Sequence, residues 1–141
     1  MGKKEIRVVL DTNVLVSALL FAGPISCFVS LWRERRIVLL LSKDVLIEYL
    51  HVLGYPKFKL TAEEVRFLVD EYILTFAELV TVAETPAVIR EDPADDKFLA
   101  LAAVGRARYI GSGDKHLLAL REYRRVKIVS PRELLESANL K

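Results

Sequence analysis

The chain contains very little cysteine. Only one of its 141 residues is a cysteine, Cys27. A lone cysteine excludes an internal disulfide framework and a cluster of thiolate metal ligands, and it fits a reducing cytoplasm. Because Cys27 lies within the apolar stretch 25–32, we expect it to be a small core residue.

Histidine is also scarce. The two histidines, His51 and His116, are far apart in the chain and lack the spacing of metal ligands. We therefore expect both to lie at the surface, and no mechanism based on histidine is needed.

Linkers, internal repeats and low-complexity segments are also absent, and the chain has only six glycines and five prolines. A chain of this length is long enough for one domain that buries roughly two-thirds of its unfolded surface, and too short for two ordinary domains. Its 52% hydrophobic content supports a substantial core. We expect a single domain over residues 1–141.

One uncharged run, residues 12–32, approaches the length of a membrane span. Gly23 and Pro24 cut this run in two, and Asp11 stands where the hydrophobic region of a signal peptide would begin. The run therefore predicts two short helices that face the core, and no membrane association.

Charge is segregated along the chain, although the net charge is only +2. Residues 1–60 carry a net charge of +4, residues 61–102 carry −7, and residues 103–141 carry +5. Most basic clusters are expected to be solvated faces. Several together could also neutralise phosphates around an acidic centre.

Hydrophobic periodicity predicts an α/β fold in which short strands alternate with helices. The predicted strands are apolar runs at 6–10, 37–41, 79–82, 109–111 and 126–129, as expected for buried parallel strands. The predicted helices span 14–21, 25–35, 43–53, 62–77, 95–106, 115–120 and 132–137. Ser42, Thr61 and Ser130 are expected to cap three of them.

Four acidic residues interrupt this apolar pattern: Asp11, Glu48, Asp96 and Asp114. A buried carboxylate without a partner costs several kcal/mol or takes up a proton, so four such residues indicate a shared cation. Hard oxygen ligands favour Mg²⁺ or Mn²⁺.

The predicted sheet offers a place where these acids can meet. Ligands of open parallel sheets bind beyond the carboxyl ends of the strands, where the strand order reverses. Asp11 directly follows the first strand and Asp114 follows the fourth, so pairing of those strands would bring both carboxylates together. Glu48 and Asp96 would reach inward from helices.

Each acid also has a simpler interpretation. Asp114 could only cap the short helix that follows it, and Glu48 could extend into solvent. In the group Asp92, Asp95 and Asp96, Asp92 is the natural cap because Pro93 suits the first helical turn. Asp95 would then be a reciprocal capping partner of Asp92 or an acid that the helix dipole favours, which leaves Asp96 for the site.

The four acids stand in four segments: 9–14 (Val-Leu-Asp-Thr-Asn-Val), 42–48 (Ser to Glu), 92–102 (Asp-Pro-Ala-Asp-Asp-Lys-Phe-Leu-Ala-Leu-Ala) and 112–115 (Ser-Gly-Asp-Lys). Together these segments resemble a PIN domain, in particular the PIN family of toxin components of toxin-antitoxin systems. The resemblance covers nearly the whole chain. It rests on the ordered set, since an Asp-Thr-Asn after a strand is a weak motif alone.

The resemblance implies a five-stranded parallel sheet in the order 3-2-1-4-5 and a metal-dependent ribonuclease activity, with RNA as substrate. The other possible binding partners are an antitoxin protein and a second copy of the chain. The resemblance assigns the metal ligands to Asp11, Glu48, Asp96 and Asp114, with Asn13 and Ser112 as polar supports. Glu48 could be a further ligand or could orient the attacking water.

Rival classes share parts of this pattern. A haloacid-dehalogenase-like phosphatase also has an Asp after its first strand, but Asn13 breaks the usual Asp-x-Asp pair. A receiver domain would need paired acids near the first strand and a late lysine. The main non-enzyme alternative is an RNA- or antitoxin-binding module that has the same fold and has lost catalytic turnover.

Overall fold

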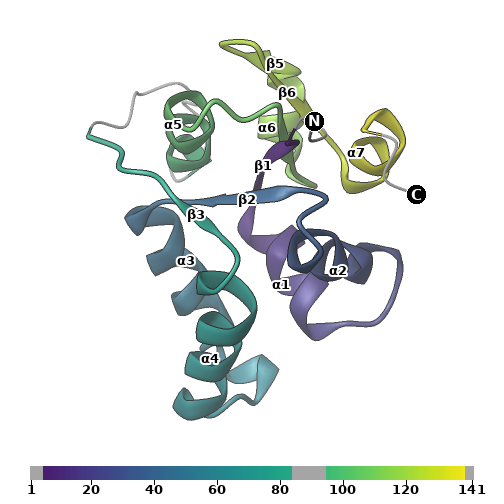
Figure 1. Cartoon of the computed structure of the whole chain (residues 1–141). Coiled ribbons are helices and arrows are strands. Elements are labelled where there is room, and N and C mark those ends of the chain that lie inside the picture. The colour runs from purple at the N-terminus through teal and green to yellow at the C-terminus, as the bar shows by residue number, and fades with distance from the viewer. Residues whose placement is uncertain (1–4, 84–94, 139–141) are drawn as a thin grey trace.

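A mixed sheet of six strands forms the centre of the molecule (Figure 1). The computed structural model describes residues 5–83 and 95–138. The spatial order of the strands is β3 (Glu78–Leu79), β2 (Val38–Leu41), β1 (Arg7–Leu10), β4 (Tyr109–Gly111), β6 (Val126–Val129) and β5 (Glu122–Tyr123). All neighbouring strands are parallel except β5 and β6, which are antiparallel.

The prediction of five parallel strands was therefore wrong in one respect. A strand overlaps each of the five predicted ranges, although β3 shares only Leu79 with the predicted 79–82, and these strands keep the predicted order. The two-residue strand β5 adds an antiparallel edge. Arg124 and Arg125 both adopt positive φ values, 46° and 70°, which is the backbone of a two-residue hairpin turn. Such turns usually contain Asn or Gly, so a pair of arginines gave no signal.

Seven α-helices surround the sheet in the described part of the chain. They are α1 (Thr12–Leu20), α2 (Cys27–Arg33), α3 (Lys43–Leu53), α4 (Ala62–Leu68), α5 (Asp96–Val104), α6 (Lys115–Leu120) and α7 (Pro131–Ser137). The predicted caps Ser42, Thr61 and Ser130 are confirmed, because each side chain accepts a hydrogen bond from a backbone N–H in the first turn.

Two predicted helices are built from two pieces. The helix predicted at 25–35 consists of a 3₁₀ turn, η1 (Pro24–Ser26), followed by α2, and the helix predicted at 62–77 continues from α4 into a π-helix, η3 (Val69–Leu74). The indole of Trp32 donates a 2.6 Å hydrogen bond to the carbonyl of Tyr72 in this π-helical stretch. Another 3₁₀ turn, η2 (Pro56–Phe58), connects α3 to α4.

The prediction for Cys27 was wrong, because this residue is exposed. The core-facing side of α2 is occupied by Phe28, Leu31 and Trp32, all of which are buried. Cys27 precedes them at the first position of the helix and lies outside this stripe.

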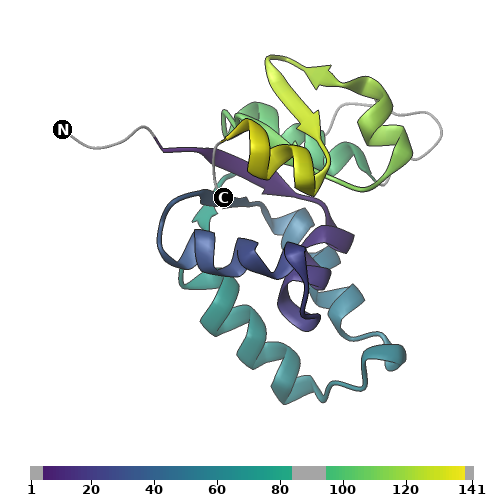
Figure 2. The same ribbon diagram turned by 90° about the vertical axis from the view of Figure 1, so that its right-hand side faces the viewer.

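The helices cover both faces of the sheet. In Figures 1 and 2, α1 to α4 lie on one side of β2 and α5 lies on the other. The strands between them are aliphatic and almost fully buried, for example Val8, Val9 and Leu10 in β1. Within the described residues no single helix has the length and apolarity for a membrane span; α1 and the segment Pro24–Arg33 pass only as a pair bent by 95°.

Candidate functional site

The first two acids lie at the carboxyl ends of the central strands. β1 and β4 pair in parallel with Leu10 opposite Gly111, and the backbone N–H of Asp11 donates to the carbonyl of Gly111 over 3.0 Å. β1 has β2 on its other side, so the order of the chain reverses between β1 and β4. Asp11 therefore stands at the point where ligands of open α/β sheets bind.

Ser112 connects the two carboxylate residues. Its hydroxyl donates a 2.5 Å hydrogen bond to Oδ2 of Asp11 and accepts one of 2.9 Å from the backbone N–H of Asp114. The Ser112 side chain is fully buried, so these two bonds satisfy it inside the protein. Next to it, Gly111 allows close packing, since a Cβ there would lie 2.9 Å from the side chain of Leu10.

Both acids also cap helices. Oδ1 of Asp11 accepts from the N–H of Val14 at the start of α1, and Oδ1 of Asp114 accepts from the N–H groups of His116 and Leu117 at the start of α6. The capping interpretation of Asp114 therefore describes a real contact. Because both capping bonds of Asp114 use Oδ1, the cap is compatible with a role for Oδ2 at the candidate site.

Burial raises the pKa of the Asp11 carboxyl above its ordinary value. Hydrogen bonds from Ser112 and from the backbone of Val14 and Gly113 lower the pKa, while the negative charge of Asp114 raises it further. Asp11 is only 4% exposed, so little water is available to stabilise its charge. A cation at this position would supply the missing stabilisation.

Glu48 is held beside this pair by two contacts that the sequence analysis missed. One of its oxygens accepts a hydrogen bond from the hydroxyl of Thr12, the residue that follows Asp11. Its other oxygen, Oε1, lies 2.7 Å from Nζ of Lys97. Glu48 is thus half-buried and paired, and it does not extend freely into solvent.

Tyr49 anchors the helix that carries Glu48. Its hydroxyl donates a 2.5 Å hydrogen bond to the carbonyl of Leu10, the last residue of β1, and its side chain is fully buried. Burial raises the pKa of Tyr49 well above 10, and the charges of Asp11 and Glu48 raise it further. The tyrosine hydroxyl therefore lies close to both acids, which places α3 against the end of β1.

Asp96 is buried like Asp11, with 3% of its surface exposed. It begins α5, and its neighbour Lys97 reaches Glu48, so the first turn of α5 lies beside α3. Asp95 precedes it at the cap position, where its side chain makes no capping bond. The predicted cap Asp92 and its neighbour Pro93 lie outside the described residues.

Asn13, the other predicted polar support, is exposed, and no hydrogen bond from its side chain to Asp11, Glu48 or Asp114 is found in the described part of the chain. Thr12, Tyr49 and Lys97 are the residues that the sequence analysis missed. The only feature of the sequence that could have indicated them is their position, because each stands directly after one of the acids.

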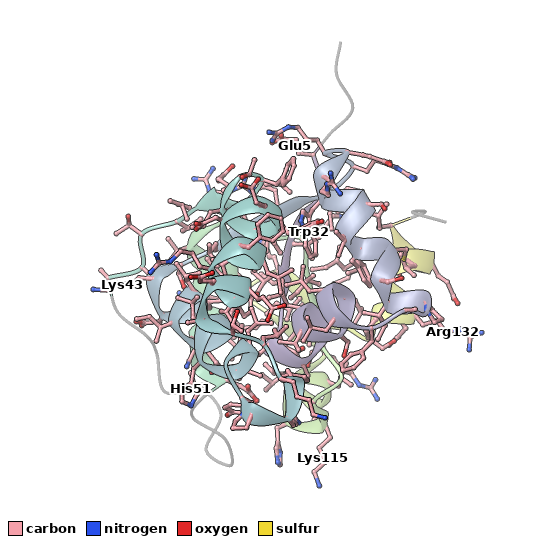
Figure 3. All side chains as sticks on the ribbon, turned by 90° about the horizontal axis from the view of Figure 1, so that it is seen from below. Glu5, Trp32, Lys43, His51, Lys115 and Arg132 are labelled. Carbon is pink, nitrogen blue, oxygen red and sulfur yellow. The ribbon has the colours of Figure 1, made fainter. Side chains whose placement is uncertain are left out.

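The arginine clusters among the described residues do not surround the acids. The exposed arginines at 33, 35 and 36, at 106 and 108, and at 124 and 125 precede β2, β4 and β6, so they lie at the opposite edge of the parallel sheet from Asp11. Figure 3 shows the same separation: Glu5, which precedes β1, lies on the far side of the molecule from Lys115, which follows β4. The exposure of these clusters agrees with the expectation that most basic clusters are solvated faces, and their position does not support the alternative that they neutralise phosphates around the acidic centre.

The chemical type of these side chains suits a hard divalent cation, because all four predicted ligands are carboxylates and burial raises the pKa of Asp11 despite its hydrogen bonds. Among residues 5–83 and 95–138, however, no three acidic, histidine or cysteine side chains converge closely enough to surround one ion. Glu48, for example, is occupied by Thr12 and Lys97.

Comparisons with known proteins agree with this architecture. The family model described as PIN domain matches residues 7–116, a range that contains all four acids. The uncharacterized protein MJ1680 of Methanocaldococcus jannaschii is 33% identical over 149 residues, covering 96% of this chain and 94% of that protein. A chain in the crystal structure of FitAcB from Neisseria gonorrhoeae has a TM-score of 0.55 at 18% identity, covering 89% of this chain and 98% of that chain. The last likeness concerns the fold alone.

Proposed function

Because the chain belongs to the PIN domain family, whose members are generally metal-dependent nucleases, we propose that it is a metal-dependent ribonuclease that hydrolyses phosphodiester bonds in RNA. The observation that carries the proposal is the buried Asp11, joined through Ser112 to Asp114 at the ends of two paired central strands. Family membership also removes the haloacid-dehalogenase-like phosphatase as an alternative.

We assign Asp11, Asp96 and Asp114 to the metal, and Glu48 to the metal or to the attacking water. Mg²⁺ or Mn²⁺, when bound, would neutralise charge on the phosphate and promote attack by water. Ser112 holds Asp11 in place, and Tyr49 holds the helix that carries Glu48. Thr12 and Lys97 fix the position of the Glu48 carboxylate.

A binding module on the same fold is the second candidate function. It is favoured by the engagement of both Glu48 oxygens, since an acid held by Thr12 and Lys97 is less available to a cation. Such a protein would bind RNA or an antitoxin without cleaving RNA.

We further propose a toxin role, with an antitoxin protein or a second copy of this chain as partner. Support comes from exposed apolar side chains on α4 and η3, namely Phe67 at 57% and Leu74 at 38% exposure. Cytoplasmic location stays a prediction from the sequence.

The test is an RNA cleavage assay with the full chain. Protein treated with EDTA should leave a short single-stranded RNA intact and should cleave it once Mn²⁺ is added in excess. Asp11→Asn and Asp114→Asn should each abolish most of this cleavage. Asp44→Asn is the matched control, because Asp44 is exposed in the first turn of α3. Intact RNA with wild-type protein and Mn²⁺ would favour the binding module.

A further inference from the structure

A groove opens between α1 and the η2 turn. Its volume is about 550 Å³, and its lining combines apolar, polar and basic side chains. The lining residues are Asn13, Val16, Ser17, Leu20, Phe21, Lys57, Phe58 and Leu60. The proposed chemistry uses none of them.

Helix α1 links the groove to the acidic site. Asp11 caps this helix, and Asn13, Ser17 and Leu20 follow at helical spacing along one stripe. Phe21 closes the stripe at the other end of the helix. From Asn13 to Phe21 the stripe is about 12 Å long at 1.5 Å per residue. A polymer bound at the acids therefore needs only a short length of its own to reach Phe21.

The far end of the groove is aromatic and basic. Phe21 is 54% exposed, and its ring centroid lies 6.1 Å from that of Phe58. The ammonium of Lys57 lies 5.1 Å from the Phe58 centroid, and Lys57 is itself exposed. An open ring beside a cation can stack an unpaired base while the cation neutralises a phosphate.

We propose that this groove binds single-stranded RNA, with a base stacked on Phe21 and a phosphate contacted by Lys57. This inference rests on the proposed function, because the RNA is the substrate whose cleaved bond lies at the acids. Single-stranded RNA fits better than a duplex, since bases in a duplex are already stacked and cannot cover the ring. The positive charge of Lys57 and the polar side chains of Asn13 and Ser17 in the lining favour RNA over an apolar protein helix.

The chain contains a matched control for the aromatic ring. Phe67 is 57% exposed, nearly the same as Phe21, but it lies on α4 close in sequence to Glu63, Glu64 and Glu71. An RNA strand should avoid that acidic surface. Loss of Phe67 therefore tests whether any exposed ring has the effect expected of Phe21.

The experiment measures RNA binding by fluorescence anisotropy, with a labelled single-stranded RNA of about ten nucleotides and no metal. All variants carry Asp11→Asn, so that RNA is not cleaved. Phe21→Ala and Phe21→Leu should weaken binding by about tenfold, the lower part of the range for loss of one stacked base. Phe21→Trp should bind normally, and its emission should be quenched by RNA. Phe67→Ala should bind like the parent.

Lys57 is tested through salt dependence. Lys57→Gln should reduce the slope of log affinity against log salt by about 0.7, the value for one phosphate contact on a single strand. Thermal unfolding of each variant checks that the fold is kept. A duplex of the same sequence should not distinguish Phe21→Ala from the parent.

Several results would overturn the inference. These are parental RNA binding by Phe21→Leu, equal losses for Phe21→Ala and Phe67→Ala, or no RNA binding by the Asp11→Asn parent at low salt. A change in sedimentation of Phe21→Ala with unchanged RNA binding would assign the groove to a protein contact. If the wild type binds through Phe21 but never cleaves, the groove stands and the nuclease proposal fails. If the wild type cleaves RNA and the Phe21 substitutions leave RNA binding unchanged, the nuclease proposal stands and the groove inference fails.

Discussion

The ammonium of Lys97 lies 2.7 Å from Oε1 of Glu48 and joins the first turn of α5 to the middle of α3. The two side chains are 26% and 22% exposed, so the pair is partly shielded from water. Because Thr12 binds the other oxygen, the position of Glu48 depends on both neighbours. This contact leads to the first prediction.

Lys97→Met should tighten Mn²⁺ binding, because a cation that competes for Glu48 is removed. We expect a change of roughly fivefold, equivalent to about 1 kcal/mol for a partly exposed ion pair. Titration calorimetry of the wild type, Lys97→Met and Lys97→Arg measures it, with Lys43→Met as an exposed control on the same helix as Glu48. Unchanged or weaker Mn²⁺ binding by Lys97→Met would place Glu48 outside the metal site.

Asp11→Asn should raise the thermal midpoint at neutral pH while it removes activity. Burial raises the pKa of this carboxyl in the folded protein, so its contribution to stability is fully present below the unfolded value near 3.8 and is lost as pH rises. The advantage of the asparagine should therefore be largest near pH 7 and should vanish below about pH 4. Thermal unfolding across this range, with exposed Asp44→Asn as control, gives the comparison. An Asp11→Asn advantage that grows toward acid would contradict the burial argument.

Tyr49→Phe should lower the free energy of unfolding by about 1 kcal/mol at pH 7, since it removes one buried hydrogen bond to Leu10. The pKa of Tyr49 is raised in the folded protein, so its contribution to stability is present below pH 10 and is lost as pH rises above that value. Urea unfolding at pH 8 and at pH 11 should show a smaller alkaline loss for Tyr49→Phe than for the wild type. Tyr55→Phe, at an exposed position, should leave the free energy of unfolding unchanged at both pH values.

Asp96→Asn and Asp95→Asn should behave differently although the residues are adjacent. Asp96 is buried, and its replacement should slow single-turnover RNA cleavage by at least about a hundredfold, as loss of a charge-stabilising group does. Asp95→Asn should lose only a few tenths of a kcal/mol of helix-dipole stabilisation, roughly the value for a first-turn charge. An inactive Asp95→Asn together with an active Asp96→Asn would mean that the two roles are exchanged.

The sequence was sufficient for the main architecture because local and global signals coincide there. The aliphatic strands, the caps Ser42, Thr61 and Ser130, and the chain order of the acids all point to one parallel arrangement. The pairing of β1 with β4 then brings Asp11 and Asp114 together, as the sequence predicted.

The sequence was not sufficient where a feature depends on distant packing. The pairing of Lys97 with Glu48 requires the crossing of α5 and α3, and nothing in either helix specifies it. The Arg124–Arg125 turn lacks the usual hairpin residues, so β5 was missed. Exposure of Cys27 depends on which side of α2 meets the core.

Mn²⁺ binding measured by calorimetry and thermal shift tests most directly whether the acids form a metal centre. We expect the wild type to stay folded in EDTA, to bind Mn²⁺ weakly and to gain thermal stability from it, because carboxylate sites that retain water bind such ions without building the fold. Asp11→Asn and Asp114→Asn should each lose most of this response, whereas Asp44→Asn should keep it. A wild type that shows no response at millimolar Mn²⁺, or an Asp11→Asn variant that responds equally, would contradict the account.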